Sequence, residues 1–217
     1  SYAVAYNSLG SAYFRKNLFD RAAEGFSRAI ALDPGNAIFY NNRGLAYAAL
    51  SEIDMAITDY LKALSLDPDY AGAYHNLGVA FHAKGIYERA VVEYTRAIDI
   101  EADNAIYYNN RGLSYAALRS YDRAIADYTK SISLKPDFAD AFTGRGVAYG
   151  ELGRFDAAVA DFTRAVSLAP SSASAYVNRA AAYARMQNIS MALSDFQRAC
   201  QMGNARGCEG ANAIREK

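Results

Sequence analysis

The chain has 217 residues, of which 52% are hydrophobic and 21% charged, a balance that excludes a disordered chain. Its 23 basic and 23 acidic side chains give a formal net charge of zero, which argues against a nucleic-acid partner. No apolar run approaches the ~18 residues that span a bilayer, so we expect no membrane insertion.

One spacing of 34 residues recurs along the chain and divides it into six units. Four of the units end in proline, which stops a helix. Four series of small or aromatic residues share this period, which predicts a repeat protein. The glycine series is Gly10, Gly44, Gly78, Gly112 and Gly146, and the alanine series is Ala22, Ala56, Ala90, Ala124, Ala158 and Ala192.

Each unit contains two helical patterns. In the fourth unit, Tyr108, Gly112 and Tyr115 stand at i, i+4 and i+7 on one face of a first helix. Ala124 and Tyr128 stand at i and i+4 on a second helix. We therefore expect each unit to be a helical hairpin that buries its apolar face only by stacking on its neighbours.

The pattern aromatic-x-x-x-Gly-x-x-Tyr, followed by Ala, an aromatic residue, Ala and Pro, resembles the tetratricopeptide repeat. The resemblance implies an all-α fold, a right-handed α-solenoid of antiparallel hairpins, in a single domain over residues 1–217. Residues 207–217 resemble the start of a seventh first helix and are expected to form a capping helix. The expected repeats are 3–36, 37–70, 71–104, 105–138, 139–172 and 173–206.

In this family the first helices line a concave groove through positions two, five, six, nine, twelve and thirteen of each repeat, here called the groove positions. Asparagines at positions five and six form a series similar to the asparagine ladder of O-linked N-acetylglucosamine transferase, which suits an extended peptide backbone. The alternative is that they only support a loop or the neighbouring helix. The candidate peptide-binding residues are Asn7, Asn41, Asn42, Asn76, Asn109, Asn110, Asn178, Leu45, Val79, Leu113, His75 and His82.

The apolar members of these positions, together with Ile38 and Ile106, predict a partner segment that is partly apolar. The carboxylate clamp that grips chaperone tails also needs lysine at position five and asparagine at position nine, and lysine and arginine in a third repeat. Only its asparagine at position six is matched here, so chaperone-tail binding is not expected. His75 and His82 stand two helical turns apart, too far to share one metal ion. We expect no metal site and no cofactor.

Four repeats carry arginine at position seven and aspartate sixteen residues later, whereas the repeats with Leu9 and Leu77 carry Gly25 and Glu93 there. This spacing predicts a partly buried ion pair between the two helices of a hairpin, with a structural role. The expected pairs are Arg43 with Asp59, Arg111 with Asp127, Arg145 with Asp161, and Arg179 with Asp195. Six aromatic residues lie outside the repeat series and are expected to be free of the core: Tyr2, Tyr70, Tyr107, Phe14, Phe39 and Phe138.

Cys200 and Cys208 fall near the end of the last repeat and the start of the expected cap. Their spacing resembles that of Sel1-like and cysteine-rich bacterial repeats, where such a pair bridges adjacent helices; the alternative is two half-buried thiols. A disulfide would imply a periplasmic or secreted protein, and free thiols a cytoplasmic one.

We find no phosphate-binding loop, nucleophile elbow or paired Cys and His in the sequence, and interpret the chain as a non-enzymatic scaffold that binds a protein segment in its groove. Two alternatives remain. The chain is a structural module that forms homo-oligomers through the solenoid ends, or it is an accessory domain of a larger protein, which the absence of a starting Met at Ser1 would fit.

Overall fold

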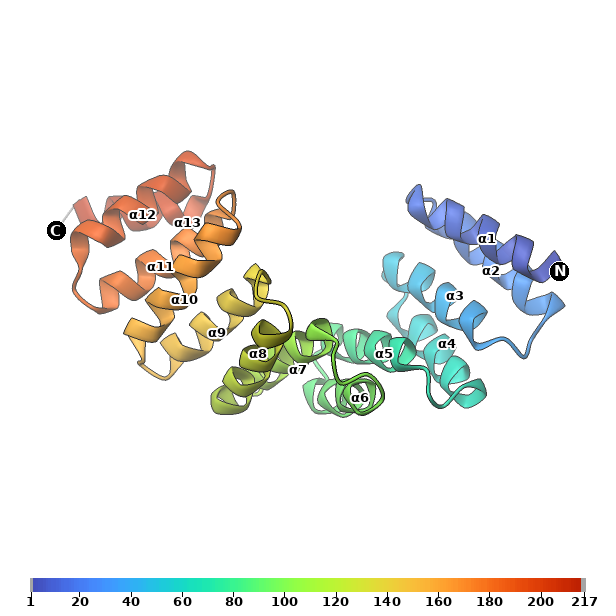
Figure 1. Ribbon diagram of the computed structural model, residues 1–217. Coiled ribbons are helices and arrows are strands. Elements are labelled where there is room, and N and C mark those ends of the chain that lie inside the picture. The colour runs from blue at the N-terminus through green and yellow to red at the C-terminus, as the bar shows by residue number, and fades with distance from the viewer. Residues whose placement is uncertain (1, 216–217) are drawn as a thin grey trace. The chain divides into compact units, whose positions relative to one another are not determined.

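The computed structural model describes residues 2–215, which form thirteen helices and no strand (Figure 1). The all-α prediction is confirmed. The helices are α1 (Tyr2–Arg15), α2 (Phe19–Leu32), α3 (Ala37–Ala49), α4 (Ile53–Leu66), α5 (Ala71–Ala83), α6 (Tyr87–Ile100), α7 (Ala105–Ala117), α8 (Tyr121–Leu134), α9 (Ala139–Glu151), α10 (Phe155–Leu168), α11 (Ala173–Arg185), α12 (Ile189–Gln201) and α13 (Ala205–Arg215).

In repeats two to six, the first helix of the hairpin begins at the first residue of the expected repeat. These helices are α3, α5, α7, α9 and α11. Asn36 caps α3 because its side-chain oxygen accepts a hydrogen bond from the backbone N–H of Ile38 at 3.1 Å. Asn104 caps α7 in the same way. Between the helices of a hairpin the chain reverses through one residue of positive φ, which is glycine only at Gly85 and Gly153 of the six repeats.

The glycine series marks the crossing of the two helices in a hairpin. A Cβ atom placed on Gly44 would lie 2.6 Å from Cε1 of Tyr60, whose ring is fully buried. On Gly146 it would lie 2.7 Å from the ring of Phe162. The aromatic ring of the second helix therefore occupies the space that a side chain on the first helix would need.

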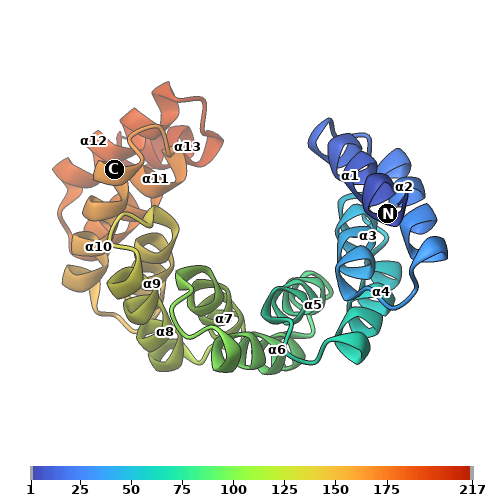
Figure 2. The same cartoon turned by 45° about the vertical axis from the view of Figure 1, so that its right-hand side comes forward.

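The chain separates into two compact units, Ser1–Asp103 with α1 to α6 and Asn104–Lys217 with α7 to α13. Within each unit, the second helix of a hairpin packs on the first helix of the next, and successive first helices also touch (Figure 2). The first helices thus form one continuous row in each unit. The single solenoid over residues 1–217 stays a prediction.

Two expectations need correction. Phe39 and Tyr107, expected to be free of the core, are both buried at position three of their repeats. Phe39 packs against Ala3 and Ala29, because this position of α3 faces the preceding hairpin. The cap α13 begins at Ala205, two residues before the expected start, and the last two residues of the expected cap, 216–217, lie outside the described part of the chain.

Among residues 2–215, no helix has the length and apolar character needed to cross a membrane. The same residues hold no group of three His, Cys, Asp or Glu side chains arranged to bind a metal ion.

Candidate functional site

The asparagines of the first unit are hydrogen-bonded to one another across repeats. The side-chain amide of Asn42 donates to the side-chain oxygen of Asn7, and that of Asn76 donates to Asn41, both at 2.9 Å. Position six of one repeat is thus joined to position five of the repeat before it. Asn41 is only 5% exposed, whereas the other three are half-buried and keep part of their hydrogen-bonding capacity.

The second unit does not repeat this arrangement. The Asn109 amide donates to the neighbouring Asn110 side chain at 3.2 Å, and position six of the next repeat is Gly144. A Cβ atom on Gly144 would lie 2.5 Å from Cζ of Tyr128, so the tyrosine ring fills the place of an asparagine. Asn178, in the last repeat, is half-buried.

The apolar groove positions are accessible. Val79 and Leu113 are exposed and Leu45 is half-buried. His75 lies 5.8 Å from the Tyr94 ring, and burial is the main cause that lowers its pKa.

The second histidine, His82, has a different aromatic neighbour. Its ring lies 5.0 Å from the ring of Tyr87, and burial likewise lowers the pKa of His82. Both histidines are therefore half-buried and shifted toward the neutral form.

Each unit has a pocket at its groove positions. The N-terminal groove pocket has a volume of about 210 Å³ and the C-terminal groove pocket about 320 Å³. The N-terminal groove pocket is lined by Ser11, Phe14, Arg15, Phe26, Asn42 and Leu45. The C-terminal groove pocket is lined by Gly146, Val147, Gly150, Glu151, Phe155, Phe162, Asn178, Ala181, Ala182 and Arg185.

The two pockets are equivalent by position. Phe26 and Asn42 in the first correspond to Phe162 and Asn178 in the second, each four repeats later. Each pocket also contains an arginine, and the Arg185 guanidinium lies 5.7 Å from the Phe155 ring. Each therefore offers an aromatic wall, an amide and a cation.

One hydroxyl group distinguishes these two places from the middle of the chain. The residue that contributes the aromatic wall is Phe26 or Phe162 at the pockets, but Tyr60, Tyr94 or Tyr128 in repeats two to four. At Gly144 the hydroxyl oxygen of Tyr128 would lie 2.8 Å from a Cβ atom, so this group reaches position six of the next repeat. Phe26 and Phe162 have no hydroxyl group to place there. The change from tyrosine to phenylalanine is visible in the sequence, although Phe196 in the sixth repeat shares it.

The four expected ion pairs are all present in the structure. In the fifth repeat, Nε and Nη2 of Arg145 donate to the two carboxylate oxygens of Asp161 at 2.7 and 2.8 Å. The other three pairs have the same bidentate geometry, and all four aspartates are buried. The hydrogen bonds that Arg145 donates to Asp161 are the main cause that raises the pKa of Arg145.

A third partner joins neighbouring repeats. Nη1 of Arg145 donates to the hydroxyl of Thr129, two positions past the aspartate of the preceding repeat, at 3.0 Å. Arg43 with Ser27 and Arg179 with Thr163 repeat this contact at 3.1 and 3.2 Å. The hydroxyl at position twenty-five was not recognised in the sequence, although it precedes every arginine of the series.

Repeat three has different residues at the positions of the ion pair and of the hydroxyl. Leu77, 1% exposed, occupies the position of the arginine, and Leu61 occupies the position of the hydroxyl. Glu93 takes the place of the aspartate and is 5% exposed, with one carboxylate oxygen lacking any hydrogen bond within the described residues. Its nearest cation is Arg96, at 3.7 Å, and burial raises the pKa of Glu93.

At the end of the second unit, a disulfide joins Cys200 of α12 to Cys208 of α13. The two helices also approach closely, since a Cβ atom on Gly207 would lie 2.7 Å from Cβ of Ala199. The bond therefore ties the cap to the last hairpin.

Family models cover most of the chain. A model described as TPR repeat matches residues 10–51, 44–85 and 80–119, and one described as tetratricopeptide repeat matches 109–173 and 143–206. The chain belongs to the tetratricopeptide repeat family, whose members generally act as interaction modules for proteins.

Several solved structures resemble the chain. MamA protein is 30% identical with a TM-score of 0.69, over 79% of this chain and 94% of that one. YrrB, described as a TPR protein with an unusual peptide-binding site, is 24% identical with a TM-score of 0.73, over 90% and 100%. Pseudomonas aeruginosa pilF is 17% identical with a TM-score of 0.85, over 99% and 97%. The last two show the fold alone. No curated protein matches the chain.

Proposed function

We propose that the chain is a non-enzymatic scaffold that binds a partly apolar protein segment, an extended peptide or a helix, at the groove positions of its first helices. The observation that carries the proposal is the pair of equivalent pockets built around Phe26 and Phe162. Family membership supports the general role, and the peptide-binding site named for YrrB supports a peptide as ligand.

The pockets define the kind of side chain that the partner inserts. Phe162 and Val147 offer apolar surface, Asn178 and Arg185 offer hydrogen-bond donors, and Glu151 adds a carboxylate. An apolar side chain buried there gains about 1.5–3 kcal/mol, and the donors suit the carbonyl groups of the segment that carries it.

The asparagines contribute in two ways. Asn42 and Asn76 are half-buried, and each donates one hydrogen bond to the preceding repeat, so they are proposed to bind the partner's backbone. Asn7, Asn109 and Asn110 are half-buried and keep the same role. Asn41 is buried, so we assign it the support of Asn76 and not contact with the partner.

The test is a peptide-display selection against the purified protein, followed by affinity measurements on variants. Phe162→Tyr adds a hydroxyl where the C-terminal groove pocket is empty, and Phe26→Tyr does the same in the first unit. We expect the selected peptides to lose about tenfold in affinity for the variant of the pocket they use, since filling it displaces a buried apolar group.

Phe142→Tyr is the matched control. It makes the same chemical change at position four, where the other five repeats carry tyrosine, and leaves both pockets unaltered. Enriched peptides that bind both pocket variants as tightly as the parent protein would remove the pockets from the proposal. A folded protein that enriches no peptide would favour self-association, which concentration-dependent light scattering measures.

The disulfide supports an oxidising compartment, and we propose a periplasmic or secreted location on that ground. The mass of the protein purified from its natural source, before and after reduction, tests this. If the mass does not increase by two hydrogen atoms on reduction, the natural protein has no disulfide and the argument for an oxidising compartment fails.

A further inference from the structure

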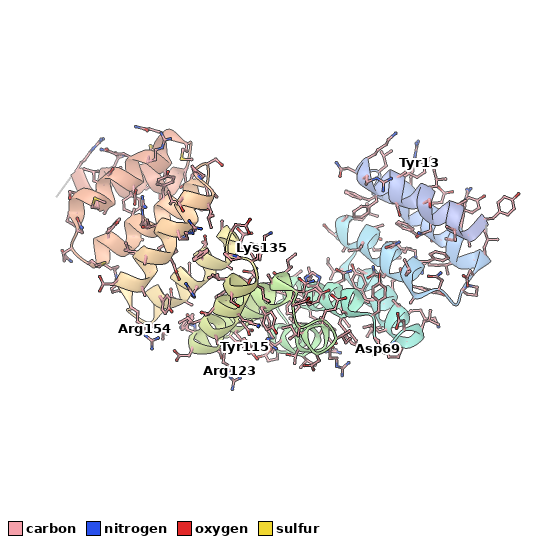
Figure 3. All side chains as sticks on the ribbon, viewed as in Figure 1. Tyr13, Asp69, Tyr115, Arg123, Lys135 and Arg154 are labelled. Atoms are coloured by element: carbon pink, nitrogen blue, oxygen red, sulfur yellow. A yellow bond between two sulfur atoms is a disulfide. The ribbon has the colours of Figure 1, made fainter. Side chains whose placement is uncertain are left out.

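A third pocket lies away from the groove positions, between α1 and α2. Its volume is about 170 Å³, and its walls include Arg21, Arg28, Leu9 and Gly25. We call it the arginine pocket. Figure 3 shows Tyr13, which also lines it, on α1.

The arginine pocket is separate from the proposed groove. Tyr6, Leu9 and Tyr13 stand at positions four, seven and eleven of the first repeat. At 3.6 residues per turn, these positions point about 170° around α1 from the groove positions. A ligand in this pocket therefore leaves the groove open.

The aromatic rings of α1 hold both arginines. The Arg21 guanidinium lies 5.8 Å from the centre of the Tyr13 ring, and that of Arg28 lies 5.6 Å from the Tyr6 ring. Within residues 2–215, Arg21 forms no ion pair, whereas Arg28 pairs with the exposed Glu24 at 2.6 Å. Two cations and one carboxylate leave the pocket with a net positive charge.

Repeat three shows what fills the equivalent space. There Arg89 lies 4.3 Å from the Phe81 ring and Arg96 lies 5.5 Å from the Tyr74 ring, the same two arginine–aromatic contacts. Between them stands the carboxylate of Glu93, at the position that Gly25 holds in repeat one.

Every repeat except the first has a carboxylate at this position, and the first has a cavity. Gly25 packs so closely on α1 that a Cβ atom there would lie 3.0 Å from the Cα of Gly10. The hairpin is closed tightly at that point, and the two arginines remain beside the empty space.

We infer that the arginine pocket binds the carboxylate of an aspartate or glutamate from an acidic partner segment, which takes the place that Glu93 fills in repeat three. Leu9 lines the pocket, is 44% exposed and offers apolar contact to the methylene groups of that side chain. The exposed pair between Arg28 and Glu24 is easily exchanged, because surface ion pairs contribute little.

The test uses capped glutamate, N-acetyl-glutamate methylamide, titrated at constant ionic strength while the arginine Nε–Hε signals are followed by NMR. We expect saturable shifts of the Arg21 and Arg28 signals. Capped glutamine has the same shape without charge and should bind roughly tenfold more weakly. Arg89 and Arg96 should not respond, because Glu93 already occupies their site.

Arg21→Gln and Arg28→Gln should each abolish saturation, and Arg89→Gln should leave it unchanged; circular dichroism checks that all three fold. Equal shifts at all four arginines would show only general screening and overturn the inference. So would saturation by inorganic phosphate without saturation by capped glutamate, which would assign the pocket to a different anion.

Discussion

Replacing Asp161 by alanine tests how far the buried ion pairs hold the repeats together. The change removes two short charge-assisted hydrogen bonds and leaves the Arg145 side chain, 17% exposed, with the Thr129 hydroxyl as its hydrogen-bond acceptor. Breaking a buried pair costs about 3–5 kcal/mol, and the remaining exposure and the Thr129 contact offset part of it. We expect the free energy of unfolding to fall by about 2–3 kcal/mol.

Urea denaturation followed by circular dichroism measures the fall in the free energy of unfolding. Hydrogen exchange in α9 and α10 shows whether the fifth repeat is the one destabilised. Arg145→Leu/Asp161→Ala should recover most of the stability, because it removes the unpaired charge and because Leu77 is buried at this position in repeat three. The control is Asp122→Ala, whose partner Arg154 lies 3.6 Å away on the surface, with an expected loss below about 0.5 kcal/mol. Additive effects of the two single changes would refute the reasoning.

Three further predictions concern single sites. Glu93→Gln should stabilise the protein by about 1 kcal/mol at pH 7, because this carboxyl is buried with one oxygen lacking a hydrogen bond within the described residues, unlike a carboxylate held beside the exposed Arg21 and Arg28. Burial raises the pKa of Glu93, so the gain should disappear below about pH 4.5, where the folded and unfolded states are both protonated, as thermal melts against pH will show. Gly44→Ala should cost at least about 1–3 kcal/mol because of the Tyr60 ring, whereas Gly150→Ala, with open space around its Cβ position, should be neutral or stabilising in the same melts. Reduction of the disulfide between Cys200 and Cys208 should cost about 2 kcal/mol and accelerate hydrogen exchange in α13 first, and unchanged exchange there would contradict its role as a tie.

The hairpins were predictable because one period carries their packing. A glycine at each crossing, with an aromatic ring sixteen residues later, specifies two helices in close contact, as Gly44 and Tyr60 show. The spacing of Arg145 and Asp161 indicated their pairing for the same reason, since both lie on helices whose register the period had fixed.

The contacts between repeats were harder to predict. Phe39 and Tyr107 were expected outside the core because they belong to no packing series within a single hairpin, yet both are buried, and it is the preceding hairpin that covers Phe39. The same reason hid the hydroxyl of Thr129 and the pairing of Asn76 with Asn41, each a contact between residues of neighbouring repeats. A periodic sequence gives the register of such contacts only when adjacent repeats are compared position by position.

The candidate sites lie where a repeat departs from its siblings. A residue shared by all repeats serves packing that all repeats need, as the glycines at the crossings do. Phe162 lacks the hydroxyl that Tyr60, Tyr94 and Tyr128 carry in repeats two to four, and Gly25 lacks the carboxylate that the other five repeats carry. A pocket lies at each of these two positions; Asn178 and Arg185 line the one, and Arg21 and Arg28 line the other. Since the fold tolerates the missing group at both positions, the polar groups left beside them are available to a ligand.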